Sequence, residues 1–153
     1  APKHVQQLVE EGHLRWDSLG EFCALGESFN FVAEAKGNAK AALLGKAVET
    51  ATQRLLENDN SPGRRVGQTD NRDSHFYFAL YWSEALALQT EDADLTEYFA
   101  PIATALSDNK AKILAEMAAV QGVPANLGGY YHTDAAKTAA VMRPSQTFNA
   151  IIG

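Results

Sequence analysis

The residues best suited to chemistry are five cations in the first half of the chain, all at expected helix boundaries or in loops. Lys3 and His4 lie where a first helix is expected to begin, and Arg15 follows the expected end of that helix. Arg64 and Arg65 lie in a loop flanked by proline and glycine. Boundaries of this kind allow side chains from separate segments to converge on one anion.

A phosphate dianion would suit such a group of cations. Arginine offers a planar fork of donors, and histidine offers a donor that can become charged near neutral pH. Spacing alone does not select this interpretation, because solvated cations that balance the 19 acidic residues explain the pattern more simply.

The common catalytic and nucleotide-binding signatures are absent from the sequence. There is no G-x-G-x-x-G, no Walker-type phosphate loop and no H-E-x-x-H. His4 and His13 are poorly spaced for a metal site, because they are nine residues apart with a glycine between them. His75 lies among aromatic residues and is predicted to be a hydrogen-bonded core histidine, whereas His132 is predicted to lie in a surface loop.

Charge and cysteine content limit the partners and the compartment. The net charge of -6 would repel DNA or RNA. The single cysteine, Cys23, rules out an internal disulfide and suits a reducing cytosol, so we expect a cytoplasmic protein. Because apolar residues flank it, Cys23 is predicted to be a buried thiol.

No run approaches the ~18 apolar residues of a membrane span, and no apolar signal-peptide region opens the chain, so no membrane partner is expected. The first residue is Ala rather than Met, which indicates a processed product or a fragment.

Length and composition predict one folded domain over residues 1–153. The 153 residues are enough to bury a core, and 46% hydrophobic with 21% charged residues is typical of a globular protein.

Helical periodicity runs through almost the whole chain. A first short helix should end at Gly12, and a second, capped by Asp17 or Ser18, should fade near Gly37. The clearest helical stripe has spacing i, i+3, i+4, i+7 and i+11 and consists of Leu44, Ala47, Val48, Ala51 and Leu55.

The second half is also predicted to be helical. Residues 74–89 could start as a buried strand, but the length of the apolar segment favours a helix buried on most sides. Two helices should follow, separated near Asp108–Asn109, and two short ones are expected at 135–142 and 145–151. We therefore predict an all-α fold, or nearly so.

Four long strings resemble one known family, the monomeric NADP-dependent isocitrate dehydrogenases, in order and spacing. Together they span nearly the whole chain and match the C-terminal part of that family. The strings are Gly12–Phe22 (GHLRWDSLGEF), Asp70–Trp82 (DNRDSHFYFALYW), Gly128–Tyr131 (GGYY) and Met142–Ala150 (MRPSQTFNA). One departure is Asp73, where the family usually has glycine, so the following helix could be capped differently.

The resemblance implies a function for the complete polypeptide. Family members are single chains several times longer than this one, and they oxidise isocitrate with NADP and Mg or Mn, then decarboxylate the product to 2-oxoglutarate. Their large domain is built from both ends of the chain around an inserted domain, and this segment resembles its last part. The isocitrate and metal residues are implied to lie upstream, so we expect no catalytic and no metal-binding residue here, and the upstream remainder of the chain as a partner.

The resemblance also selects cofactor residues. The histidine and two arginines that grip the 2′-phosphate of NADP in the family correspond to His4, Arg15 and Arg64. Lys3 and Asp17 are flanking positions implied to touch the phosphate or the adenosine. Two other classes stay open: a non-catalytic helical module that binds an anion or a nucleotide, and a purely structural interaction domain.

Overall fold

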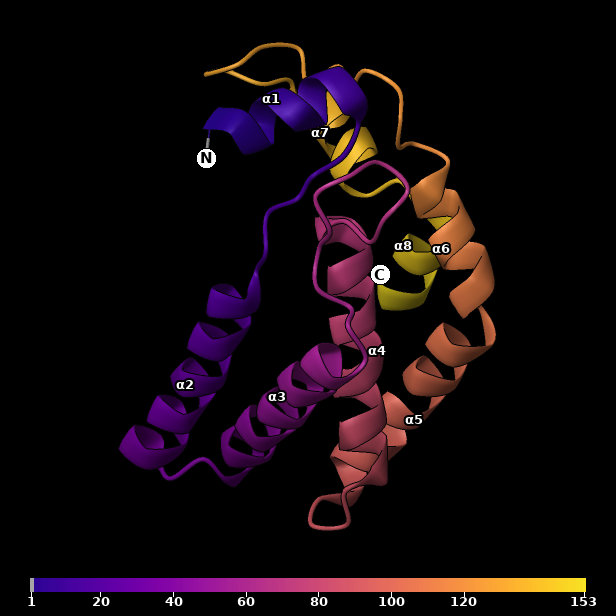
Figure 1. Ribbon diagram of the computed structural model, residues 1–153. Coiled ribbons are helices and arrows are strands. Elements are labelled where there is room, and N and C mark those ends of the chain that lie inside the picture. Colours follow the sequence, from indigo (N-terminus) through magenta and orange to yellow (C-terminus); the bar gives the residue numbers. More distant parts are fainter. Residues whose placement is uncertain (1) are drawn as a thin grey trace.

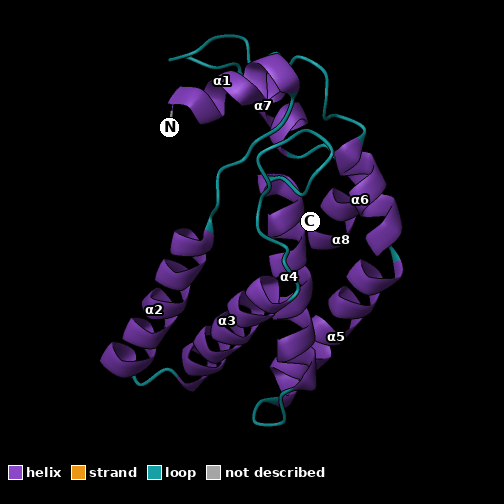
Figure 2. Ribbon diagram, in the orientation of Figure 1, coloured by secondary structure: helices purple, strands orange, loops and turns teal. Residues whose placement is uncertain are grey.

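The structure, a computed structural model, describes residues 2–153 and is built from helices. Within that range there are eight helices and no strand (Figure 2). The prediction of an all-α fold is therefore confirmed. The helices are α1 (Pro2–Glu11), α2 (Leu19–Lys36), α3 (Ala39–Glu57), α4 (Asn71–Leu88), α5 (Ala93–Asp108), α6 (Lys110–Ala118), α7 (Ala135–Met142) and α8 (Gln146–Ile152).

The long helices pack around α4. As Figure 1 shows, α2 and α3 form a hairpin on one side of α4, and α5, α6 and α8 lie on the other. α3 packs against both α2 and α4, and α4 also packs against α5. One buried cluster joins these helices and consists of Phe22, Val48, Ala51, Leu55, Phe76, Phe78, Leu80, Tyr81, Leu106, Ile113 and Met117. The segment read as a helix buried on most sides is therefore the central helix of the fold.

Helix boundaries follow local chemistry as predicted. Gly37 ends α2 with a left-handed φ of 59°, and its N–H donates to the Ala33 carbonyl. At the start of α2, Asp17 Oδ1 accepts the Leu19 N–H at 3.0 Å, while Ser18 makes no capping hydrogen bond with its side chain. α8 begins one residue later than expected, because Ser145 is its cap and accepts the Phe148 N–H.

Gly12 allows the end of α1 to lie against the segment 120–125, which follows α6. Its φ of +61° lies in the left-handed region, and a Cβ there would overlap the carbonyl oxygens of Val120 and Val123. The same approach allows the Gly122 N–H to donate to the Glu11 carbonyl at 2.7 Å. α1 makes few contacts with the other helices, and the backbone of the segment 120–125 holds it through hydrogen bonds to Val9 and Glu11.

α4 begins with a capping box in which Asp73 takes part. The Asp70 carboxylate accepts from the backbone of the first turn, and the Asp73 Oδ2 accepts the Asp70 N–H at 2.8 Å. Asp73 thus caps α4 through its side chain, which a glycine at this position could not do. Burial is the main cause that raises the pKa of Asp73 to about 6, since the carboxylate loses water on one side of the helix end.

Candidate functional site

Two regions that are distant in sequence meet at the end of the molecule that carries α1. One is α1 with the connection 12–18 that follows it, and the other is the loop 58–70. Gln7 Nε2 donates to the Arg64 carbonyl at 3.0 Å, and His13 Nε2 lies 2.8 Å from the Gly63 carbonyl oxygen. His4 lies one helical turn before Gln7, on the same helix. The fold therefore brings the segments of His4, Arg15 and Arg64 together.

His4 and Arg15 are close enough to influence each other. The His4 ring meets the ring of Trp16, the neighbour of Arg15, edge to face with centroids 5.5 Å apart. Burial, followed by the charge of Arg15, lowers the pKa of His4 below its usual value. Arg15 supplies a permanent positive charge beside the His4 ring, which can itself become charged when an anion binds, so the pair suits an anion.

Two donors of this pair are buried without a protein partner. His4 Nδ1 and Arg15 Nε are both shielded from solvent, and neither has a hydrogen-bond partner among residues 2–153. Buried polar atoms are normally paired, because leaving a donor unsatisfied costs about 1–3 kcal/mol. Two unpaired nitrogens on an arginine and a neighbouring histidine can donate to the oxygens of an anion such as a phosphate group.

The other candidates are exposed. Arg64 lies on the loop, and Lys3 lies on the first turn of α1. Asp17 is exposed too, and its Oδ1 is used by the Leu19 N–H. The structure thus places the backbone of Arg64 against α1, but its side chain is free to reach outward.

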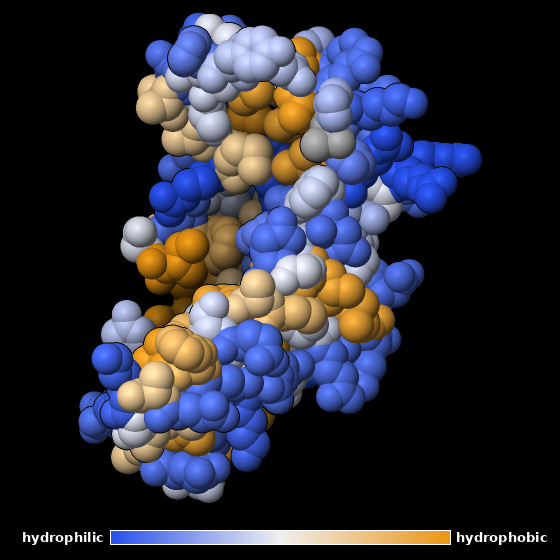
Figure 3. Space-filling view, turned by 90° about the vertical axis from the view of Figure 1, so that its left-hand side faces the viewer, coloured by the Kyte–Doolittle hydropathy of each residue, from blue (hydrophilic) through white to orange (hydrophobic). Residues whose placement is uncertain are grey.

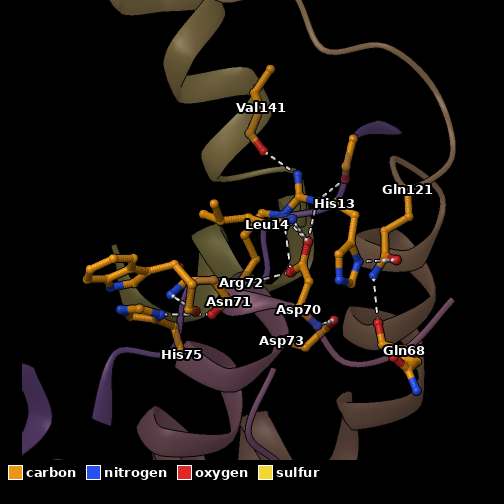
Figure 4. A network of polar contacts seen from close by, with 12 residues as sticks. His13, Leu14, Gln68, Asp70, Asn71, Arg72, Asp73, His75, Gln121 and Val141 are labelled. Carbon is orange, nitrogen blue, oxygen red and sulfur yellow. Dashed lines mark hydrogen bonds and ion pairs between the residues drawn. The ribbon is translucent and has the colours of Figure 1, made fainter. Parts of the chain in front are cut away.

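A second, buried network lies directly beneath the cations. Figure 4 shows the Arg72 guanidinium between the Asp70 carboxylate and the carbonyl of Val141. Arg72 Nη1 donates to the Val141 carbonyl at 2.8 Å, and Nη2 donates to the Gly12 carbonyl at 2.6 Å and to Asp70 Oδ2. Asp70 Oδ2 also accepts the Leu14 N–H. One guanidinium therefore joins the start of α4, the end of α7 and the connection that leads to Arg15.

His13 and Gln121 hold the loop from the other side. His13 is fully buried, with Nδ1 3.0 Å from Gln121 Oε1. Gln121 Oε1 also accepts the Gly67 N–H, and its Nε2 donates to the Gln68 carbonyl. Sequence reasoning missed both residues as well as Arg72, since His13 was considered only as a metal ligand. The one available signal was an arginine two residues after a capping aspartate, inside an otherwise apolar helix.

Two expectations about reactive side chains were wrong. Cys23 is exposed, because α2 turns Phe22 and Gly26 toward the core and Cys23 away from it. His75 is also exposed, although its ring lies edge-on to Phe22 at 5.0 Å and its Nδ1 lies 2.8 Å from the Asn71 carbonyl oxygen. His132, by contrast, lies exposed in a loop, as predicted.

A pocket beside α4 is a further feature of the described chain. Within residues 2–153, no group of three or more His, Cys, Asp or Glu side chains is placed to hold a metal ion, and no helix is both long and apolar enough to span a membrane. The pocket beside α4, of about 350 Å³, is lined mainly by apolar side chains, and neither His4, Arg15 nor Arg64 lines it. Its lining includes Phe78, Trp82, Met117, Phe148 and Ile152.

Comparison with known proteins identifies the family of this chain. The family model of monomeric isocitrate dehydrogenase matches residues 1–153, the whole chain. The chain belongs to the monomeric isocitrate dehydrogenase family. This membership confirms the resemblance seen in the four sequence strings.

Several curated relatives of this family are similar over nearly the full chain. Isocitrate dehydrogenase (NADP) 2 of Mycobacterium tuberculosis is 55% identical over 152 residues, isocitrate dehydrogenase (NADP) of Azotobacter vinelandii is 54% identical, and that of Corynebacterium glutamicum is 53% identical. Each match covers 99% of this chain but only 20% or 21% of the relative. The chain therefore spans about one fifth of the length of the isocitrate dehydrogenases that it matches.

Proposed function

We propose that this chain is the C-terminal part of the large domain of an NADP-dependent isocitrate dehydrogenase and supplies the grip on the 2′-phosphate of NADP. The observation that supports this most directly is the pair of buried nitrogens without a hydrogen-bond partner, His4 Nδ1 and Arg15 Nε, on side chains close enough for the charge of Arg15 to influence His4. The relatives' names, which specify NADP, support the choice of cofactor.

Each residue of the site has a distinct part in this proposal. Arg15 donates to the phosphate from a half-buried position, and His4 donates beside it as an imidazolium. Arg64 reaches the phosphate from the exposed loop, which is fixed against α1 by the Gln7 hydrogen bond. Lys3 adds positive charge at the rim, and Asp17 contacts the adenosine side. When NADP is bound, its nicotinamide supplies the hydride acceptor for the oxidation of isocitrate.

The remaining chemistry is assigned to the rest of the polypeptide. We place the isocitrate site and the Mg or Mn site upstream of this segment, and we propose a cytoplasmic location for the complete enzyme. The upstream polypeptide should also cover apolar side chains that this segment exposes, such as Phe31, Leu88 and Tyr131, which are 70, 79 and 89% exposed. Figure 3 shows such hydrophobic groups at the surface of the side that faces left in Figure 1.

The selectivity of the complete enzyme tests the phosphate site. Arg15→Ala or Arg64→Ala should lower kcat/KM for NADP by roughly 10- to 150-fold, since a charge-assisted hydrogen bond is worth roughly 1.5–3 kcal/mol and about 1.4 kcal/mol equals one decade. Because NAD lacks the phosphate, kcat/KM for NAD should stay nearly constant. Arg65→Ala, in the same loop, is the matched control and should change neither value more than about twofold. A parallel loss for both cofactors in Arg15→Ala and Arg64→Ala would refute the assignment.

A second experiment tests the division of the enzyme. The 153-residue chain alone should not reduce NADP with isocitrate and Mg, whereas the complete polypeptide should. Steady turnover by the purified segment would place the reaction centre here and contradict the proposal. The second candidate, a non-catalytic helical module that binds an anion, predicts instead that the natural reading frame encodes no upstream catalytic sequence.

A further inference from the structure

His13 is a buried histidine whose two ring nitrogens both face oxygen atoms. Its side chain has no solvent exposure. Nε2 lies 2.8 Å from the Gly63 carbonyl oxygen, and Nδ1 lies 3.0 Å from Gln121 Oε1. A carbonyl oxygen can only accept, so Nε2 must carry a hydrogen.

The orientation of the Gln121 amide decides what Nδ1 must carry. Gln121 Oε1 accepts the Gly67 N–H at 2.9 Å, and Gln121 Nε2 donates to the Gln68 carbonyl at 3.1 Å. Turning the amide around would set its NH2 group against the Gly67 N–H and its oxygen against the Gln68 carbonyl oxygen. Both contacts would then be repulsive, so the backbone fixes the amide with its oxygen toward His13. Nδ1 therefore also faces an acceptor.

We propose that His13 is an imidazolium that acts as a positioning residue for the phosphate site, because it ties the loop bearing Arg64 to the segment bearing Arg15. With a hydrogen on each nitrogen, the ring donates to the Gly63 carbonyl and to Gln121 at the same time. Gly63 directly precedes Arg64 in the chain, and Arg15 lies two residues after His13. One charged ring thus sets the separation of the two arginine segments. This inference rests on the proposed function of the two arginines.

The groups around His13 include two acids that can compensate its charge. Asp70 and Asp73 lie at the start of α4, and a positive His13 is one of the influences that lower the pKa of Asp73, against the larger effect of its burial. The positive charge of Arg72 would repel a positive His13, but Arg72 forms an ion pair with Asp70. The remaining charged residues on the surrounding segments are exposed or half-buried and lie nearer to water: Glu11, Arg15, Asp17, Arg64 and Arg65.

The loop itself depends on few other contacts. Within it, the Gly63 N–H donates to the Thr69 carbonyl, and Gln68 Oε1 accepts the Arg65 N–H. Apart from the one from Gln7 on α1, the described hydrogen bonds that anchor residues 63–68 from outside the loop come from His13 and Gln121. Loss of the imidazolium should therefore loosen the loop and displace Arg64 without altering the helices of the core.

Hydrogen exchange of the ligand-free complete enzyme tests the positioning. His13→Phe, which keeps the ring volume, and Gln121→Met should each increase exchange of the Gly67 amide and its loop neighbours at least tenfold. Gln121→Glu keeps an acceptor for both Nδ1 and the Gly67 N–H but loses the donor to the Gln68 carbonyl, so its loop exchange should lie between that of the unchanged enzyme and that of Gln121→Met. His132→Gln, at an exposed loop histidine, is the control and should leave exchange unchanged. Unchanged loop exchange in both His13→Phe and Gln121→Met would overturn the proposal.

Binding of two small probes separates this proposal from the proposed function. His13→Phe and Gln121→Met should weaken 2′,5′-ADP about tenfold and leave 5′-AMP, which lacks the 2′-phosphate, within about twofold. If Arg15→Ala and Arg64→Ala weaken 2′,5′-ADP selectively but the His13 and Gln121 variants do not, only the positioning role is wrong. If the arginine variants show no selectivity, the proposed function fails, whatever the loop exchange shows.

Nitrogen NMR of histidine-labelled enzyme tests the charge directly. The resonances absent from His13→Phe should show both ring nitrogens protonated. A pattern with one protonated and one unprotonated nitrogen at pH 6 would overturn the imidazolium assignment.

Discussion

The Arg72 guanidinium and the Asp70 carboxylate form an ion pair that is almost completely buried, with side chains 3% and 1% exposed. Each partner has further hydrogen bonds, Arg72 to two backbone carbonyls and Asp70 to two backbone N–H groups. A buried pair is tolerated only when its other donors and acceptors are satisfied in this way. Because these bonds join four segments, the pair links the core helix α4 to the base of the phosphate site (Figure 4).

Removing one partner of this pair should destabilise the fold strongly. Arg72→Met leaves the Asp70 carboxylate buried without its counter-charge, which typically costs about 3–5 kcal/mol. Urea unfolding should show this loss. Arg54→Met is the matched control, since Arg54 pairs with Glu84 at 2.6 Å but both side chains are partly exposed, and it should cost about 1 kcal/mol or less. Equal effects of the two variants would show that the burial of the Asp70 pair is unimportant.

The carboxyl group of Asp73 should make stability fall with rising pH. Its pKa in the folded chain is raised to about 6 from 3.8, so the fold favours the protonated form. The stability from this group is therefore complete below about pH 4 and is lost as pH rises through about 6, up to roughly 3 kcal/mol in total. Asp73→Asn cannot ionise and should lack this decline. Unfolding free energies between pH 4 and 7 test it; parallel curves for the two proteins would contradict the prediction.

His4 should make the recognition of the 2′-phosphate depend on pH. Without ligand, burial and then Arg15 lower the pKa of His4, and a bound phosphate dianion should raise it. The positive charge of His4 therefore contributes fully to phosphate affinity below the pKa that His4 has without ligand. This contribution is lost as pH rises through the higher pKa that His4 has in the complex. The ratio of 2′,5′-ADP to 5′-AMP affinity should fall between pH 6.5 and 9, a range where the phosphate, with its pKa near 6, stays a dianion.

His4→Gln is the variant that isolates this effect. It keeps a neutral hydrogen-bonding side chain, so its affinity ratio should start lower and stay nearly flat over the same pH range. An equal slope in His4→Gln would assign the titration to another group.

Two glycines allow the approach of α1 to be tested with a matched pair. Gly12 and Gly37 have φ values of +61° and +59°, so alanine should cost each of them about 1–2 kcal/mol in backbone strain. A Cβ at Gly37 meets open space, whereas one at Gly12 overlaps two carbonyl oxygens. Gly12→Ala should therefore destabilise clearly more than Gly37→Ala and should also weaken 2′,5′-ADP, since it displaces α1. Equal unfolding free energies would show that the close approach is not needed.

The sequence by itself determined the helices and the family. Periodic apolar residues such as Leu44, Val48 and Leu55 define a helix face without reference to distant residues, and Gly37 or Ser145 end or cap a helix through contacts within a few residues. The candidate cations were also visible in the sequence, but their role came from the resemblance of long strings. Local spacing could not show that His4 and Arg15 would face each other.

Only the tertiary structure decided which polar residues hold the site together. His13 could have been a metal ligand, a surface residue or a buried residue that links two segments by hydrogen bonds. Its partners Gly63 and Gln121, 50 and 108 residues away, decide this. The exposure of Cys23 and His75 likewise depends on which face of α2 and α4 other helices cover, and their apolar neighbours gave the wrong answer. Secondary structure follows from interactions between near neighbours, whereas burial and hydrogen-bond partners follow from how distant segments pack.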